Sequence, residues 1–220
     1  MDSRMMAVLN FVETGSRVAD IGADHGYLSI ELVISGRASK VIATEKNIHP
    51  FEAAQKNISA AGLGGVIDIR LGDGLQVLSA SEVDTICIAG MGGALIQKIL
   101  DDAPEVVKSA RRLILQPMNG AEKIRAWLAE NNWQIADEDL AESAGIIYEI
   151  ICADKNPVSK IFKRETSPLL KKFLAQRVEK LQRVLDEMSK SPVARSSEKF
   201  VTIQSESDAL RLAMTKVRGF

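Results

Sequence analysis

A glycine-rich acidic segment near the N-terminus has the residue types and the spacing to hold a nucleotide-like ligand. It runs Asp20-Ile-Gly-Ala-Asp-His-Gly26 and begins inside the apolar run 17–21, which we interpret as a short buried strand. Tyr27 then opens an amphipathic helix. Glycines in such a strand-to-helix turn let main-chain N–H groups approach a bound ligand closely. The spacing Asp-x-Gly-x-Asp-x-Gly differs from the dinucleotide-binding pattern G-x-G-x-x-G.

The same segment resembles the D/E-x-G-x-G-x-G loop of class I S-adenosylmethionine-dependent methyltransferases. Asp24 stands where that loop has its middle glycine. On its own, the segment leaves open a second interpretation, an ordinary glycine turn between a strand and a helix. Residues elsewhere in the chain must decide between the two.

Two further carboxylates follow predicted strands. Glu45 comes 25 residues after Asp20, and an acidic side chain there can accept hydrogen bonds from both ribose hydroxyls of a nucleoside. Asp73 lies between Gly72 and Gly74, where a carboxylate can accept from the adenine amino group and the glycines leave room for a flat base. The alternatives are a solvated carboxylate for Glu45 and a simple Asp-Gly turn for Asp73.

The segment Ala89-Gly-Met-Gly-Gly93 follows the fourth apolar run, where the transferred methyl group is expected to meet its acceptor. Enzymes that methylate an exocyclic base amine usually carry Asn/Asp-Pro-Pro-aromatic here, and this chain does not. A ring nitrogen already has a lone pair in the base plane and needs mostly alignment with the sulfonium methyl. The sequence therefore favours a ring nitrogen as acceptor, and Met91 is a candidate at the reacting centre.

Four side chains are candidates for contact with the substrate or the developing charge. Asp24 would face the sulfonium region and stabilise positive charge on a methylated ring nitrogen. A histidine side chain can transfer protons near neutral pH, so His25 is a candidate for this role and can also contact a base. The alternative for both is capping of the following helix. Tyr27 stacks on a base or simply packs, and Gln116, at the end of a strand, either bonds a substrate edge or belongs to a structural turn.

Glycine and polar residues divide the first two thirds of the chain into alternating strands and helices. A short helix over 1–14 is expected to cover an edge of the domain. Strands joined by helices form parallel units with right-handed crossovers, so the acidic and glycine clusters should all meet at one rim of the sheet. The last two strands have no helix between them and should form an antiparallel hairpin. The predicted strands are 17–21, 40–44, 66–71, 84–89, 112–115, 133–140 and 146–153.

This order predicts an α/β fold, a seven-stranded doubly wound (Rossmann-like) class I methyltransferase domain over residues 1–155. Residues 156–220 differ, because helical spacing over 168–188 and 193–218 predicts a coiled-coil-like helical hairpin. Residues 1–154 carry 13 Lys/Arg and 22 Asp/Glu, whereas 155–220 carry 15 Lys/Arg and 7 Asp/Glu. A basic tail on an acidic body indicates a polyanionic partner.

Composition and cysteine use point to an ordinary globular protein of 220 residues. The first residues have no signal-peptide apolar core and no apolar run approaches membrane-spanning length, so we expect a cytoplasmic protein with no membrane partner. Cys87 and Cys152 lie in apolar strand-like runs and should be reduced core residues. With only His25 and His49 available, no metal site is expected.

Three motifs together identify a narrower resemblance. Asp20 to Tyr27, Ile88-Ala-Gly-Met-Gly-Gly93 and Leu115-Gln-Pro-Met118, in this order, closely resemble the bacterial tRNA adenine-N1 methyltransferases that modify adenine 22 in the D arm. The resemblance covers the chain nearly end to end. It departs at Gly26, where the family usually has Ala, and at Ser29, where Pro is usual.

The resemblance implies S-adenosylmethionine as methyl donor and tRNA as substrate. Because the hairpin is basic, we expect it to hold the tRNA backbone through phosphate contacts, and we expect a monomer or weak dimer. Open alternatives are a methyltransferase for another RNA base or a small molecule, and a non-catalytic RNA-binding protein, which only Asp24 favours. The expected catalytic residues are Asp24, His25 and Met91. The expected cofactor-binding residues are Asp20, Gly22, Asp24, Gly26, Glu45, Lys46, Gly72, Asp73, Gly74, Ala89 and Gly90. The expected substrate-binding residues are Tyr27, Gln116, Lys160, Lys163, Arg164, Lys171, Lys172 and Arg177.

Overall fold

The computed structural model describes residues 2–156 and 167–217. The chain divides into two compact units, Met1–Lys163 and Arg164–Phe220. The first unit contains every strand found in the described residues, and the described part of the second is helical. None of the helices within the described ranges is both long and apolar enough to cross a membrane.

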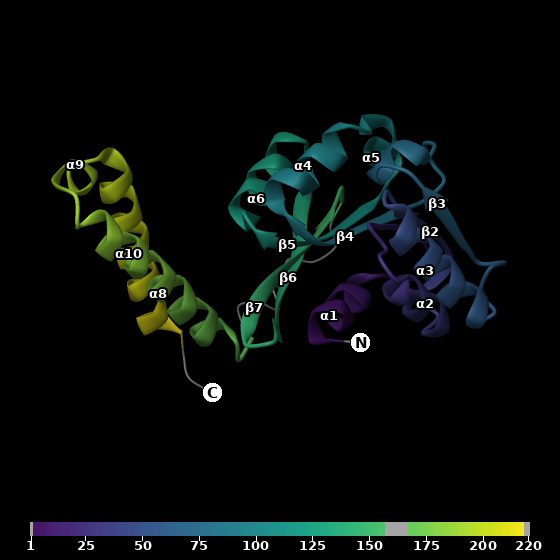
Figure 1. The fold of residues 1–220 in the computed structure, drawn as a ribbon, viewed down its shortest axis with the longest axis horizontal. Coiled ribbons are helices and arrows are strands. Elements are labelled where there is room, and N and C mark those ends of the chain that lie inside the picture. The colour runs from purple at the N-terminus through teal and green to yellow at the C-terminus, as the bar shows by residue number, and fades with distance from the viewer. Residues whose placement is uncertain (1, 157–166, 218–220) are drawn as a thin grey trace. The chain divides into compact units, whose positions relative to one another are not determined.

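A seven-stranded sheet runs through the first unit in the order β3-β2-β1-β4-β5-β7-β6 (Figure 1). The strands from β1 to β5 pair in parallel, and β7 pairs antiparallel with both β5 and β6. This confirms the predicted doubly wound sheet with a terminal hairpin. The strands are β1 (Ser16–Ile21), β2 (Ala38–Glu45), β3 (Ile67–Leu71), β4 (Thr85–Gly92), β5 (Arg112–Asn119), β6 (Gln134–Ser143) and β7 (Ile146–Asp154).

Helices cover both faces of this sheet. One hydrophobic cluster packs α4, α5 and α6 against one face, and a second packs α1, α2 and α3 against the other (Figure 1). The short helix α5, which begins at a proline, was not predicted, because six residues are too few to show a helical period. The helices are α1 (Ser3–Phe11), α2 (Tyr27–Ile34), α3 (Ile48–Ala60), α4 (Gly93–Asp101), α5 (Pro104–Ser109) and α6 (Ala121–Glu130), with a 3-10 turn η1 (Gly74–Val77).

Strand β1 shows why the central strands read as continuous apolar runs. Ala19 and Ile21 belong to the cluster on the α4 side, whereas Val18 belongs to the cluster on the α2 side. Successive side chains of a strand point to opposite faces, so a strand covered on both faces needs apolar residues at nearly every position. The same alternation turns Asp20 toward α2. Cys87 and Cys152 are free and buried in the α2-side cluster, as expected for core cysteines.

Helix α1 spans the sheet from one rim to the other. Its N-cap is Asp2, whose side chain accepts a 2.9 Å hydrogen bond from the Met5 N–H. Near this end the Arg4 side chain bonds Gln116, in the last part of β5. At the other end the Phe11 carbonyl accepts a 2.9 Å bond from Arg112, the first residue of β5. Helix α1 therefore reaches both the carboxyl and the amino rims of the parallel strands.

The second unit is a helical hairpin, as predicted. Helices α8 (Leu170–Met188) and α10 (Glu198–Lys216) pack on each other and are joined through α9 (Pro192–Arg195). Phe173, Leu174 and Leu185 of α8 are buried in this packing. An ion pair of 2.9 Å between Arg177 and Glu206 also links the two long helices.

Candidate active site

A cavity of about 430 Å³ opens at the carboxyl ends of the parallel strands, within the usual size range of small-molecule sites. It includes every expected cofactor-binding residue except Asp20 and Gly26. Segments separated by more than sixty residues in sequence therefore meet in one place. The cavity residues at the strand ends are Gly22, Asp24, Thr44, Glu45, Lys46, Gly72, Asp73, Gly74, Ala89, Gly90 and Met91.

Gly22 occupies a position that only glycine fits without rearrangement. Its φ of +72° is in the left-handed region, and its N–H donates a 2.9 Å bond to the Thr44 carbonyl. A Cβ at Gly22 would meet the terminal methyl carbon of Met91 at 2.4 Å. The turn after β1 and the last part of β4 therefore touch at the cavity.

Asp24 keeps the turn that a middle glycine would make. Its φ is +51°, and aspartate is among the few residues that tolerate this left-handed conformation. The side chain is 70% exposed, and its Oδ1 lies 3.7 Å from the Nε2 of His25. The His25 and Tyr27 rings stack with centroids 5.7 Å apart, and Tyr27 is 63% exposed.

The capping alternative for Asp24 and His25 is wrong. The N-cap of α2 is Gly26, and no side chain there bonds the helix. A Cβ at Gly26 would lie 3.4 Å from Ala54 of α3, so this glycine packs against α3 and does not line the cavity.

Asp20 anchors α2 from beneath the site. Its carboxylate accepts a 2.6 Å bond from the Ser29 hydroxyl and another from the Ser29 N–H, one of the donors that a helix start leaves unpaired. Burial raises the pKa of Asp20 to about 6, although both bonds from Ser29 act in the opposite direction. Its side chain faces α2 and does not line the cavity, so it supports the loop from behind. Its action on the amino-acid end of the cofactor, through backbone amides or water, stays a prediction.

Glu45 is a buried carboxylate at the end of β2, only 7% exposed. Its Oε1 accepts bonds of 2.9 Å from the Asn47 N–H and 3.2 Å from the Asn47 side-chain amide. Its Oε2 has no hydrogen-bond partner among the described residues. Asn47, which also lines the cavity, was not a predicted site residue, although its i+2 spacing from Glu45 is a recognisable signal for such a brace.

Asp73 extends the acidic side of the cavity at the end of β3. It is the N-cap residue of η1, but its side chain makes no capping hydrogen bond, so its carboxylate is not used by the local turn. The Gly72 N–H donates a 2.9 Å bond to the Glu45 carbonyl, which holds the two acidic positions side by side. A Cβ at Gly72 would collide with Val77 at 2.1 Å, so the glycine is required by packing.

Gln116 does not line the cavity and supports it through the Gly90 segment. It is fully buried, its Oε1 accepts a 3.0 Å bond from the Gly90 N–H, and its Nε2 donates a 3.1 Å bond to the Pro117 carbonyl. The expected contact of Gln116 with the substrate therefore finds no support in this geometry. Gly90 has φ +75°, and β4 changes register against β5 on either side of Met91. Gln116 fixes this irregular segment.

Several cavity residues could not be found from the sequence. Arg4 and Met5 enter from α1, and Leu95 and Ile99 enter from α4. No spacing relates α1 to the acidic loops, because the contact exists only through the packing of that helix across the sheet.

Among the described residues, the basic side chains of the predicted tRNA-binding segment do not line this cavity. Lys171 and Lys172 are exposed on α8 in the second unit, and Arg177 lies near the Phe173 ring with a Cζ-to-centroid distance of 6.0 Å. Lys160, Lys163 and Arg164 lie outside the described residues. Within the ranges that the structure describes, no group of three His, Cys, Asp or Glu side chains is placed to hold a metal ion.

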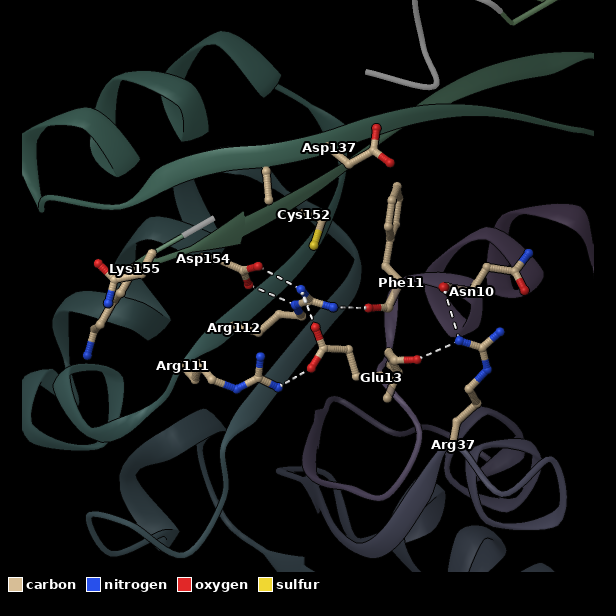
Figure 2. A pocket seen from close by; sticks show the side chains of 13 residues that line it. Asn10, Phe11, Glu13, Arg37, Arg111, Arg112, Asp137, Cys152, Asp154 and Lys155 are labelled. Carbon is tan, nitrogen blue, oxygen red and sulfur yellow. Dashed lines mark hydrogen bonds and ion pairs between the residues drawn. The ribbon is translucent and has the colours of Figure 1, made fainter. Parts of the chain in front are cut away.

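A second cavity, of about 590 Å³, lies among residues of the opposite rim (Figure 2). Four of its charged side chains pair with one another. Arg112 donates two bonds of 2.7 and 2.6 Å to Asp154, and Arg111 pairs with Glu13 at 2.6 Å. It contains none of the predicted site residues. The smaller cavity at the carboxyl rim is therefore the candidate site.

The sheet order and the acidic, glycine-lined cavity at the carboxyl rim define a Rossmann-like methyltransferase of class I. A family model described as "Methyltransferase domain" matches residues 1–151. The chain is 40% identical over 154 residues to the tRNA (adenine(22)-N(1))-methyltransferase of Bacillus subtilis, an alignment of 70% of this chain and 65% of that relative.

Solved structures agree over nearly the whole chain. The B. subtilis M1A22 tRNA methyltransferase TrmK superposes with a TM-score of 0.83 at 30% identity, covering 99% of this chain and 98% of that one. A Streptococcus pneumoniae protein in complex with S-adenosyl-L-methionine gives a TM-score of 0.84 at 33% identity, covering 97% and 100%. The chain therefore belongs to the methyltransferase-domain family, and within it to the family of tRNA (adenine-22 N1)-methyltransferases.

Proposed function

We propose that this protein transfers the methyl group of S-adenosylmethionine to N1 of adenine 22 in the D arm of tRNA. The observation that carries the proposal is the single cavity that brings Gly22, Glu45, Asp73 and Gly90 together. The relatives act as the second support, since their names specify this reaction and one was solved with S-adenosyl-L-methionine. We further propose that it acts in the cytoplasm, where its tRNA substrate would be found.

The residues at the rim fit the cofactor part by part. Asp73 would accept from the adenine amino group, and Glu45 would accept from the ribose hydroxyls through its unpartnered Oε2. Gly22 and Gly90 would let the main chain approach the amino-acid end closely. When bound, S-adenosylmethionine supplies an activated methyl group on a positively charged sulfur.

Methylation of a ring nitrogen does not require the protein to remove a proton from the acceptor. N1 of adenine carries a lone pair and no proton, so alignment of the base with the methyl group is the main requirement. The product is a cation, which the exposed carboxylate of Asp24 at the cavity would stabilise. His25 is then better suited to base contact than to proton transfer.

Access to N1 requires that the base leave its pair, because N1 lies on the Watson–Crick edge. Extruded bases are commonly held by stacking on aromatic rings. The stacked His25 and Tyr27 rings follow Asp24 directly in sequence and offer such a surface. The basic hairpin, with Lys171 and Lys172 exposed, would hold the tRNA backbone through salt-dependent phosphate contacts.

The non-catalytic alternative loses its only support. It rested on Asp24 in place of the middle loop glycine, and Asp24 keeps the left-handed turn with φ +51°. No feature of the described residues favours a small-molecule substrate over RNA.

The test is methylation of an unmodified tRNA transcript by the purified protein with S-adenosylmethionine. Nucleoside mass spectrometry should detect 1-methyladenosine, and a matched transcript with adenine 22 replaced by guanine should yield none. A different methylated nucleoside would replace the proposed target with another RNA base. Binding of tRNA without any methylation or cofactor binding would refute the enzymatic assignment.

A further inference from the structure

Arg4, on the first turn of α1, reaches the candidate site from outside the loops that the sequence motifs define. It lines the cavity, and its side chain is 19% exposed. Its Nη1 donates a 3.3 Å bond to the same Gln116 oxygen that accepts from the Gly90 N–H. A Cβ at Gly90 would lie 3.5 Å from this nitrogen. The guanidinium therefore lies directly against the Gly90 segment.

The charge of Arg4 is poorly compensated for its degree of burial. Its Nε is buried with no hydrogen-bond partner, and the nearest carboxylate oxygen in an ion pair with it, from Asp2, is 3.7 Å away. Its Nη2 bonds no residue in the described ranges. The Tyr148 ring lies 5.5 Å from its Cζ.

Two other partly buried arginines of the same unit bond carboxylates directly. Arg70 bonds Glu82 at 2.9 Å, and Arg112 bonds Asp154 at 2.6 Å. Buried cations require such partners, because desolvation is otherwise uncompensated. Arg4 is thus placed to receive an anion that the folded chain does not itself supply.

The order of strands along the rim indicates which anion this is. Asp73, Glu45, Gly22 and Gly90 lie at or just after the carboxyl ends of β3, β2, β1 and β4, which are successive neighbours in the sheet. If the carboxylates of Asp73 and Glu45 hold the adenosine, the amino-acid part of the cofactor extends toward Gly22 and Gly90. Three strand spacings separate the two ends, roughly 14 Å.

Arg4 lies at that amino-acid end. The other cationic side chain of the cavity, Lys46, is adjacent to Glu45 at the adenosine end. The methionyl part of the cofactor carries a carboxylate, and a guanidinium forms short, charge-assisted hydrogen bonds to carboxylates.

We propose that Arg4 binds the carboxylate of the methionyl part of S-adenosylmethionine, which makes α1 a part of the cofactor site. This rests on the cofactor given above. Gln116 then acts as a positioning residue, because one of its oxygens orients both the Arg4 guanidinium and the Gly90 N–H. Loss of one charge-assisted bond should weaken binding about 10- to 100-fold.

Calorimetric titration with two ligands tests this directly. S-adenosylhomocysteine carries the carboxylate, whereas 5′-methylthioadenosine has the same adenosine and no amino-acid part. Arg4→Met should weaken S-adenosylhomocysteine about 10- to 100-fold and leave 5′-methylthioadenosine within about twofold. Arg4→Lys, which keeps the charge, should recover part of the loss.

Arg37→Met is the matched control. Arg37 donates bonds of 3.3 and 2.7 Å to the Asn10 and Val12 carbonyls, beside the other end of α1 (Figure 2). The Arg37→Met substitution should loosen the same helix without changing the candidate site, which Arg37 does not line. Both ligands should therefore bind as they do to the wild type. Wild-type protein alone provides a test that needs no variant: it should bind S-adenosylmethionine at least tenfold tighter than decarboxylated S-adenosylmethionine.

The contrary outcomes are distinct. If Arg4→Met weakens both ligands equally, Arg4 has a purely structural role. If it weakens tRNA binding but leaves S-adenosylhomocysteine binding unchanged, Arg4 contacts a phosphate of the tRNA. Either result overturns the proposal. Wild-type protein that binds neither nucleoside would overturn the cofactor itself. Wild-type protein that binds the decarboxylated compound equally well would overturn only the role of Arg4.

Discussion

The hydroxyl of Ser29 donates a 2.6 Å hydrogen bond to the carboxylate of Asp20, inside the core beneath the candidate site. Both side chains are buried, and the Ser29 N–H bonds the same carboxylate. The pair ties the end of β1 to the third residue of α2 and so fixes the loop between them. A proline, usual at this position in the family that the sequence resembles, has neither donor.

The buried carboxylate predicts a specific pH dependence of stability. The folded-state pKa of Asp20 is raised from 3.8 to about 6, so between these values the folded protein binds more protons than the unfolded chain. The contribution of Asp20 to the free energy of unfolding therefore falls as pH rises through this window. Ionised Asp20 should cost the fold up to about 3 kcal/mol above pH 7.

Asp20→Asn should remove this dependence. Relative to the wild type, the free energy of unfolding of the variant should rise by up to about 3 kcal/mol between pH 4 and pH 8, in addition to any effect of the substitution that does not depend on pH. Urea unfolding at both pH values measures the difference. The exposed Glu52→Gln serves as a control that should show no such change. A difference between Asp20→Asn and wild type that stays constant with pH would contradict the raised pKa.

Gly22→Ala should damage cofactor binding through contact as well as strain. The added methyl group would meet Met91 at 2.4 Å and push that side chain into the cavity, so the affinity for S-adenosylhomocysteine should fall at least tenfold. Gly36→Ala is the matched control, since Gly36 has φ +70° and nothing within 4 Å.

Both alanine variants should lose about 1–2 kcal/mol of stability from the left-handed backbone. Only Gly22→Ala should change ligand affinity, as measured by calorimetry alongside thermal unfolding. Similar affinity in the two variants would show that the contact with Met91 is unimportant for binding.

Glu45→Gln should weaken nucleoside binding regardless of the amino-acid part. One oxygen of the buried carboxylate accepts from Asn47, and the other is free to accept from the ribose. The amide of glutamine has only one acceptor oxygen, so it cannot accept from both. The affinities for S-adenosylhomocysteine and for 5′-methylthioadenosine should both fall about 10- to 100-fold. Selective loss of only one of them would place the ribose elsewhere.

Charge reversal of Lys171 and Lys172 should separate RNA binding from cofactor binding. The double change to Glu should lower tRNA affinity and reduce the slope of log affinity against log salt by roughly 1.4 to 1.8, with S-adenosylhomocysteine affinity unchanged. Filter binding over a salt series measures this. Lys108→Glu, at an exposed position on α5, is the control. Equal loss of tRNA and cofactor affinity would identify the hairpin as a folding element.

The amino-acid sequence by itself determined the order of strands and helices and the rim at which the acidic residues meet. Both follow from local signals: apolar runs define strands, and glycines with polar residues define the turns after them. In a doubly wound sheet, parallel crossovers place these turns on one side, so Glu45 and Asp73 could be assigned to one site without coordinates.

The tertiary structure decided where individual side chains point and which remote elements enter the site. Strand alternation turned Asp20 toward α2, and the packing of β5 beneath the Gly90 segment buried Gln116, for which the sequence had left open both contact with a substrate edge and a structural turn. Arg4 reached the cavity because α1 crosses the sheet from rim to rim. Such contacts depend on how whole faces pack together, and no local residue pattern encodes that.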